Sequence, residues 1–291
     1  MAAWTAFGAV VAVVVALLLS LSYLTQQGMA ASGQLGGDES SPAPEQPADH
    51  APLGDDERAP ADGASRADAA SPPADGTTPP DGATRDPVAD SPAAETLTAD
   101  RQLSGGVLLA NVAASQGTLA VILAVAALAT GVPADAVGVS VAGLAPPVLL
   151  AGVGLGVALA VANQGIAALF RRFDVAFSED LRELLAPDSP GGWAALLLGV
   201  LPLVAVFEEL LFRGILIGAF ATGFGVDPWL LVVASSVLFA AGHGAQGAGG
   251  VVVTGALGFV LGVGFVLTDS LAAVVVAHYL VNALEFLGHE R

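Results

Sequence analysis

The chain has 291 residues, of which 54% are hydrophobic and only 12% are charged, and its mean hydropathy is +0.72. A typical globular protein has about 25% charged residues, so this composition excludes an ordinary soluble enzyme and indicates a membrane protein. The absence of cysteine excludes disulfides, iron–sulfur clusters and thiolate zinc sites. A net charge of −18 leaves no basic surface for nucleic acid.

The first apolar run, residues 4–24, is long enough to cross a bilayer. A cleaved signal peptide is the alternative interpretation, but the run lacks the basic N-terminal flank of such a peptide. We therefore expect residues 1–30 to form a membrane anchor.

A composition change follows the anchor. Residues 31–100 contain 15 acidic residues, three Arg and 11 Pro, with few large apolar side chains and no aromatic residue. Such a segment cannot offset its conformational entropy by burial, so we expect residues 31–104 to be a disordered acidic linker. The acid excess without lysine also resembles the composition of proteins from extreme halophiles.

Six further apolar segments follow, and their continuous hydrophobicity predicts helices rather than strands. The predicted fold is an all-α, polytopic transmembrane helix bundle of about seven spans. Residues 105–192 are expected to hold two spans and a connector with a short interfacial helix around Phe173–Leu185, and residues 193–289 the remaining membrane core. The six predicted spans after the anchor are 106–130, 147–169, 193–221, 228–246, 249–267 and 270–288.

Arg171 and Arg172 form the clearest basic cluster beside a span, which places their connector in the cytoplasm by the positive-inside rule. With seven spans, the linker and the C-terminus would also be cytoplasmic and the N-terminus outside. The expected location is the cell membrane. Glycines four positions apart, such as Gly258 and Gly262, are expected to let helices pack closely.

Five ionisable residues interrupt the apolar spans. An ionised side chain at mid-bilayer costs about 2.5–3.5 kcal/mol on insertion scales, so each needs a partner, a water-filled cavity or a function. Glu209 and Arg213 are four positions apart and can form an ion pair on one helix face, whereas Glu208 lies about 100° around the helix. The other two are His243 and His278.

Helical spacing indicates where these side chains meet. Asn282 follows His278 by four positions, and His243 follows Phe239 by the same interval. At 1.5 Å per residue, Glu208, His243, His278 and Asn282 fall within about two helical turns of one membrane depth. The sequence therefore predicts one buried polar cluster.

This cluster suits hydrolysis of an amide bond in a membrane-embedded cavity. A carboxylate and a histidine can hold and deprotonate a water, and a second histidine with an adjacent asparagine can donate hydrogen bonds to an oxyanion. A zinc site formed by Glu208, His243 and His278 is the alternative. The zinc-protease motif HExxH is absent.

Three motifs carry a family resemblance: Glu208, Glu209 and Arg213 match EExxxR, Phe239 and His243 match FxxxH, and His278 and Asn282 match HxxxN. In this order, within predicted spans, they resemble the CPBP family of intramembrane proteases. That family includes the type II CAAX prenyl endopeptidases and proteins linked to bacteriocin processing or immunity. The resemblance covers about residues 193–288.

The resemblance implies a role for each motif residue. Glu208 would be the base that activates water, His243 would assist it, and His278 and Asn282 would form the oxyanion site. Glu209, Arg213 and Phe239 would be supporting residues. The glutamate mechanism requires no cofactor, while zinc remains the alternative. The implied partners are the lipid bilayer and a membrane-anchored polypeptide substrate, with prenylated C-termini as the CAAX substrate class.

Two other function classes can use the same residues. A non-catalytic immunity or scaffold protein could retain the motifs as a structural network, but all motif residues are present, whereas inactive relatives tend to lose one. A transporter or proton relay could use the buried carboxylate and histidines, but no inverted repeats are evident. The sequence therefore favours an intramembrane endopeptidase.

Overall fold

A computed structural model of the chain describes residues 2–37, 92–172, 185–187 and 189–289. Over these ranges the structure consists of helices and turns without a strand, which confirms the predicted all-α class. Residues 38–91 of the predicted linker and 173–184 of the predicted interfacial helix lie outside the described residues.

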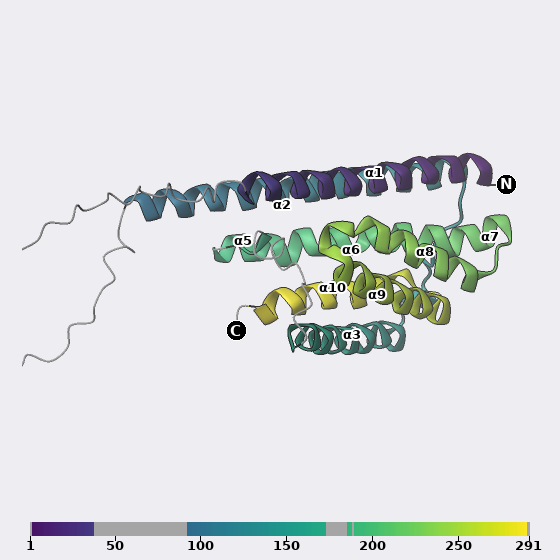
Figure 1. Ribbon diagram of the computed structural model, residues 1–291. Coiled ribbons are helices and arrows are strands. Elements are labelled where there is room, and N and C mark those ends of the chain that lie inside the picture. Colours follow the sequence, from purple (N-terminus) through teal and green to yellow (C-terminus); the bar gives the residue numbers. More distant parts are fainter. Residues whose placement is uncertain (1, 38–91, 173–184, 188, 290–291) are drawn as a thin grey trace, which may run out of the picture.

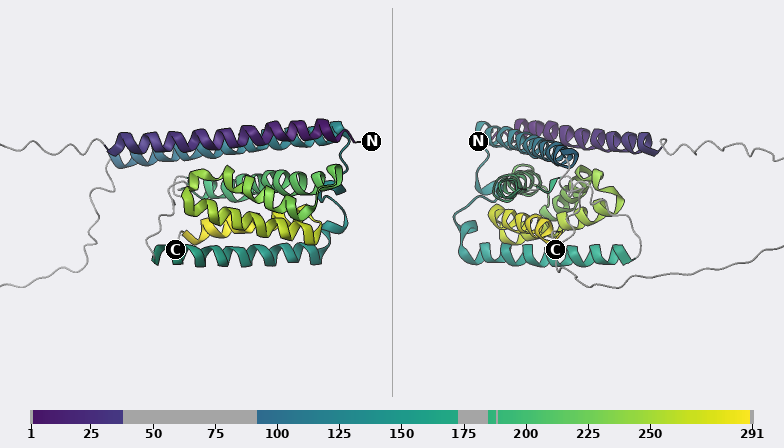
Figure 2. Two further views of the ribbon diagram at one scale, coloured as in Figure 1. Left: turned by 45° about the vertical axis from the view of Figure 1, so that its right-hand side comes forward. Right: turned by 90° about the vertical axis from the view of Figure 1, so that its left-hand side faces the viewer.

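The helices form layers that are visible in both figures of the whole chain. The hairpin of α1 and α2 lies on one face of the bundle, α3 lies on the opposite face, and the helices from α5 to α10 lie between them (Figures 1 and 2). The N-terminus and the C-terminus lie at opposite ends of the bundle (Figure 1). The α-helices are α1 Trp4–Gly37, α2 Pro92–Thr130, α3 Pro146–Arg172, α5 Pro190–Ala195, α6 Leu201–Glu209, α7 Phe220–Phe224, α8 Pro228–Gly242, α9 Gly247–Thr268 and α10 Leu271–His289.

Five short elements complete the described structure. Two are π-helical segments that join α5, α6 and α7 into one continuous helix. Three are 3-10 turns, two of them between α2 and α3 and one between α8 and α9. These elements are η1 Asp135–Val137, η2 Ala142–Leu144, η3 Leu196–Val200, η4 Leu210–Ala219 and η5 Gly244–Gln246.

Six described helical segments are long and apolar enough to cross a membrane. Large apolar side chains point outward from several of them, such as Leu128 at 80% and Leu198 at 78% exposure. This outward exposure suits contact with lipid tails rather than with water. The six segments are Trp4–Gln27, Gly105–Thr130, Pro146–Leu169, Pro190–Phe224, Gly244–Thr268 and Leu271–Gly288.

The predicted span 228–246, the fifth in chain order, is not a continuous helix. Helix α8 has 15 residues, a length of about 22 Å, which is shorter than the roughly 30 Å hydrocarbon core. It ends at Gly242, and His243 leaves the helical conformation with φ −107° and ψ 21°. Gly247, at φ 74°, then redirects the chain into α9.

The two helices that flank the acidic segment are longer than predicted. Helix α1 continues to Gly37, beyond the expected 4–24, and α2 begins at Pro92 rather than at residue 106. The predicted linker 31–104 is therefore helical at both ends. Both extensions lack internal proline, and the single Pro92 stands at the first helical position, where its missing N–H is tolerated.

Close packing between α3 and α10 positions the last helix of the core. A Cβ atom added at Gly156 would lie 2.9 Å from the Cα atom of Ala277, closer than real side chains approach. Glycine therefore permits this contact. Ala277 directly precedes His278, so the packing fixes the depth and direction of that histidine.

Candidate active site

The two adjacent glutamates lie where an α-helical turn changes into a π-helical segment. Helix α6 ends at Glu209, and the π-helical segment η4 begins at Leu210. Such segments widen the helical turn and occur often at functional sites. In this arrangement the two neighbouring carboxylates face different surroundings.

Glu209 is fully buried and belongs to a hydrogen-bonded ion cluster. Its Oε1 atom accepts hydrogen bonds from Nη1 of Arg213 at 2.8 Å and from Nδ1 of His278 at 2.6 Å. Glu209, Arg213 and His278 are 0%, 1% and 3% exposed. We call these three residues the buried ion cluster. The Glu209–Arg213 pair agrees with the helical spacing, while the bond to His278 is an additional contact.

Arg213 links the cluster to two further helices. Its Nη2 atom donates to the backbone carbonyl of Gly258 on α9 at 2.9 Å, and its guanidinium lies 4.6 Å from the ring centroid of Phe239 on α8. A side chain at position 258 would contact Phe239 and Arg213. Gly258 thus leaves room for the arginine, and Phe239 provides a cation–π contact.

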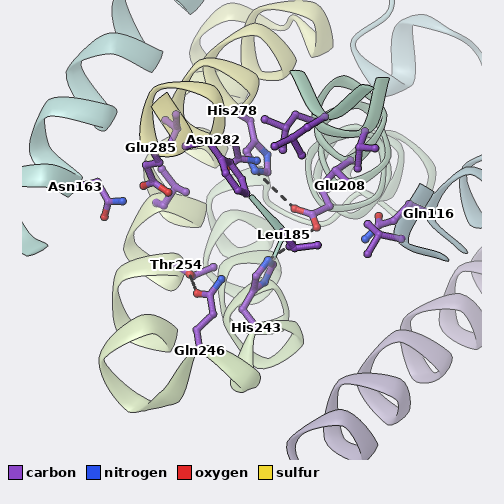
Figure 3. A pocket seen from close by; sticks show the side chains of 18 of the residues that line it. Gln116, Asn163, Leu185, Glu208, His243, Gln246, Thr254, His278, Asn282 and Glu285 are labelled. Atoms are coloured by element: carbon purple, nitrogen blue, oxygen red, sulfur yellow. Dashed lines mark hydrogen bonds and ion pairs between the residues drawn. The ribbon is translucent and has the colours of Figure 1, made fainter. Parts of the chain in front are cut away.

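Glu208 faces a cavity of about 290 Å³ instead of the ion cluster. The same cavity is lined by His243, His278 and Asn282, so the structure brings all four expected site residues together (Figure 3). The Oε1 atom of Glu208 is 3.9 Å from Nε2 of His243, and its Oε2 atom is 3.7 Å from Nε2 of His278. Both separations exceed direct hydrogen-bond length, so Glu208 makes no direct hydrogen bond to either histidine ring.

A hydrogen bond at Nδ1 orients each histidine ring. Nδ1 of His243 lies 2.8 Å from the carbonyl oxygen of Phe239, and Nδ1 of His278 lies 2.6 Å from the Glu209 carboxylate. Both partners are acceptors, so each Nδ1 carries a proton. Both Nε2 atoms therefore face Glu208. If the rings are neutral, the three groups that meet in the cavity are all acceptors, and a water can donate hydrogen bonds to two of them.

Asn282 lies one helical turn after His278 on α10 and is partly exposed to the cavity. Figure 3 shows its amide beside His278. The Asn282 amide and Nε2 of His278 lie on one wall, while Glu208 and His243 lie across the cavity. The arrangement can hold a water on one side of a bound carbonyl and hydrogen-bond donors on the other.

Several polar residues of the cavity are not among those expected from the sequence. Thr254 donates to Gln246 at 2.6 Å, and the others come from α2, α3 and α10. A polar side chain inside an apolar run is the sequence signal that could have found Gln116 and Asn163. These further polar lining residues are Gln116, Asn163, Gln246, Thr254 and Glu285.

The zinc alternative requires three protein ligands around one point. Over the described ranges, no group of three or more His, Cys, Asp or Glu residues is placed so that it could hold a metal ion. Of the residues named for zinc, Glu208 lies 3.9 Å from Nε2 of His243 and 3.7 Å from Nε2 of His278.

Comparison with known proteins adds independent support for the core. No curated protein and no solved structure matches the chain significantly. A family model does match. Residues 190–284 match the family Type II CAAX prenyl endopeptidase Rce1-like. The Rce1-like domain begins at the first residue of α5 and ends within α10.

The match confirms the resemblance that the three motifs indicate. All seven motif residues fall inside the Rce1-like domain, whereas α1, α2 and α3 fall outside it. Residues 190–284 are thus similar to the CAAX-type protease family, and six described helical segments make the chain a multi-pass membrane protein.

Proposed function

We propose that the protein is an intramembrane endopeptidase that hydrolyses a peptide bond in a membrane-associated polypeptide. The observation that supports this most strongly is the convergence of Glu208, His243 and His278 on one cavity inside an apolar bundle. The buried ion cluster pairs Glu209 with Arg213 and His278, whereas the Glu208 carboxylate faces the cavity and is placed to act on a ligand.

In the proposed reaction, Glu208 removes a proton from a water, and His243, whose Nε2 faces Glu208, assists this base. The water oxygen attacks the scissile carbonyl carbon, a C–O bond forms, and the carbonyl oxygen becomes an oxyanion. His278 and Asn282 donate hydrogen bonds to this oxyanion. The C–N bond then breaks, and Glu208 returns its proton to the leaving nitrogen.

The bond between His278 and Glu209 supports the oxyanion role. Donation from Nε2 requires a proton on that atom in addition to the proton that Nδ1 already gives to Glu209. The Glu209 carboxylate supplies a counter-charge for the doubly protonated ring. Glu209 and Arg213 are therefore supporting residues that hold His278 in its reactive orientation.

The substrate class is a membrane-anchored polypeptide cleaved near its C-terminus, with prenylated CAAX sequences as the first candidates. The family match and the largely apolar wall of the cavity support this choice. We further propose that the linker and the C-terminus are cytoplasmic, because Arg171 and Arg172 lie at the end of α3.

The test compares the C-termini of membrane proteins from cells that express the wild type or Glu208→Ala at equal levels. New C-termini that depend on Glu208 would identify the substrates. An unchanged set of C-termini, with both proteins folded in the membrane, would instead support the non-catalytic immunity or scaffold alternative.

Metal dependence is tested on the purified protein. Cleavage of a fluorogenic peptide with a farnesylated C-terminal CAAX sequence is expected to survive chelation. One bound zinc per chain, with activity lost on its removal and restored on its return, would favour a zinc site at Glu208, His243 and His278 instead.

A further inference from the structure

Gln116 brings a polar side chain to the active-site cavity from outside the Rce1-like domain. It lies on α2, which packs against α6, the helix that carries Glu208. In the view of Figure 3, its amide lies on the opposite side of Glu208 from His278 and Asn282. The α1–α2 hairpin is therefore part of the wall around the reacting groups.

A second, smaller cavity of about 180 Å³ shows where Gln116 stands. This cavity lies against α1. Its wall is apolar except for three residues that also line the main cavity. Gln116, Glu208 and His243 are the shared residues. Gln116 thus lies at the junction of the two cavities, beside the proposed base and its assisting histidine.

The packing of α2 fixes this position. The neighbouring Gly117 faces Leu203 on α6, and an added Cβ atom there would lie 3.6 Å from the leucine Cδ2 atom. Two turns further along α2, Leu123 is fully buried in the core cluster. The register of α2 against α6 therefore directs Gln116 toward the cavity.

The Oε1 atom of Gln116 is buried and has no hydrogen-bond partner among the described residues. A buried acceptor without a donor is unfavourable, so a donor from outside the protein is expected there. The nearby groups cannot supply it in their resting forms. Glu208 has only acceptor oxygens, and His243 already uses its Nδ1 proton for the Phe239 carbonyl. Water has the two protons required.

We propose that Gln116 binds the hydrolytic water together with Glu208, an inference that rests on the proposed endopeptidase function. One O–H of this water donates to the Glu208 carboxylate, and the other donates to Oε1 of Gln116. The lone pair of the water then points to the substrate carbonyl. During attack, Glu208 takes the proton it already accepts, while Gln116 keeps the second hydrogen bond as the C–O bond forms.

The first test needs no substrate. A structure of the wild-type protein in lipid, at a resolution that shows waters, should have an ordered water at hydrogen-bond distance from both Glu208 and Oε1 of Gln116. In Gln116→Met, which keeps the side-chain length and removes the acceptor, that water should be lost. A protein donor on Oε1, or no water between the two residues in the wild type, would overturn the inference.

The second test is kinetic and uses the farnesylated CAAX peptide. Gln116→Met should lower kcat about three- to tenfold, the loss expected for one neutral hydrogen bond, with KM and melting temperature unchanged. The matched control is Gln164→Met, because Gln164 is an exposed glutamine on α3 that does not line the cavity. This control should retain wild-type kcat.

The outcomes separate the two proposals. If the wild-type protein cleaves no peptide, the proposed function itself is wrong. If Glu208→Gln cleaves as well as the wild type, the assignment of Glu208 as the base is wrong. If Glu208→Gln is inactive but Gln116→Met keeps its kcat, only the role of Gln116 is wrong. A raised KM with unchanged kcat in Gln116→Met would overturn the water-binding role and assign the residue to substrate binding.

Discussion

Glu208 and Glu209 are adjacent in sequence, but the regions they face differ in charge balance and access. Glu209 is closed off from solvent and accepts hydrogen bonds from Arg213 and His278 at 2.8 and 2.6 Å. Glu208 faces a cavity, and its nearest basic atoms are the histidine nitrogens at 3.7 and 3.9 Å. One region is a packed ion cluster, and the other leaves space beside a carboxylate.

The EExxxR motif thus combines one carboxylate in a structural ion cluster, Glu209, with one that faces the cavity, Glu208. A buried charge with short, well-placed partners holds helices together, and removing one partner leaves the other unbalanced. A carboxylate that faces an open cavity keeps its oxygens available for a ligand or water. The two regions meet at His278, which bonds Glu209 through Nδ1 and faces Glu208 through Nε2.

The largest expected effect comes from exchanging each glutamate for glutamine. Glu208→Gln keeps the shape of the side chain but removes the base, so cleavage should fall by about 10²–10⁴-fold while the melting temperature stays near that of the wild type. Glu209→Gln should instead lower the melting temperature, because Arg213 loses its buried counter-charge. Both variants are measured by peptide cleavage and by thermal unfolding in detergent.

The comparison between the two regions would fail if these results were reversed. Near-wild-type cleavage by Glu208→Gln would show that another group is the base. A stable, fully active Glu209→Gln would show that the buried ion cluster does not support the site.

Arg213→Ala should act on stability first. It leaves Glu209 with only the His278 contact, and breaking a buried pair destabilises by roughly 3–5 kcal/mol. The yield of folded protein and its melting temperature should both fall. The matched control is Arg172→Ala at the exposed end of α3, which should leave both quantities unchanged. Equal melting temperatures for the two variants would contradict a structural role for the cluster.

The sequence predicts much of the difference between the ion cluster and the cavity, because helical spacing depends only on residues close together in the chain. The spacing of Glu209 and Arg213 predicts their pair, and the depth of Glu208, His243 and His278 along their spans predicts that they meet. The family match over residues 190–284 agrees with the motif order. The described residues are helical, as the continuous apolar runs predict.

What the sequence did not predict depends on how helices rotate and pack against one another. The bond between His278 and Glu209 joins residues 69 positions apart, and no local pattern selects Glu209 over Glu208 as its partner. The π-helical segment after Glu209 also changes the residue-to-residue angle that an ideal α-helix would give. Gln116 was not predicted as a site residue, because a single amide in an apolar span is also typical of a residue that only packs between helices.

Asn282→Ala tests the oxyanion role proposed for the cavity region. Removing one oxyanion donor should lower kcat about 10²–10³-fold, and the partly exposed side chain leaves little packing to lose, so stability should hold. Asn163→Ala is a suitable control, because Asn163 lines the same cavity from α3. A larger loss of kcat in the control would place the oxyanion site elsewhere in the cavity.

The smallest expected effect concerns the segment that neither region uses. Replacing residues 38–91 with a Gly/Ser linker should leave the melting temperature unchanged and cleavage within about twofold. The α1–α2 hairpin has its own contacts, since Phe7 and Leu123 are both fully buried in one core cluster and Ala3 donates to Thr130 at 2.7 Å. A connection between two docked helices contributes little to stability when its length changes, because the loop-closure free energy varies only slowly with length.

The control for this exchange is Phe7→Ala, which attacks the hairpin contacts instead of the connection. It should lower the melting temperature, since truncating a buried phenylalanine costs about 3–5 kcal/mol, and it should weaken cleavage by disturbing the helix that carries Gln116. If the linker exchange abolishes cleavage while the melting temperature is unchanged, the acidic segment acts on the substrate. The charged residues at positions 38–91 would then belong to the functional site, together with the cavity and the buried ion cluster.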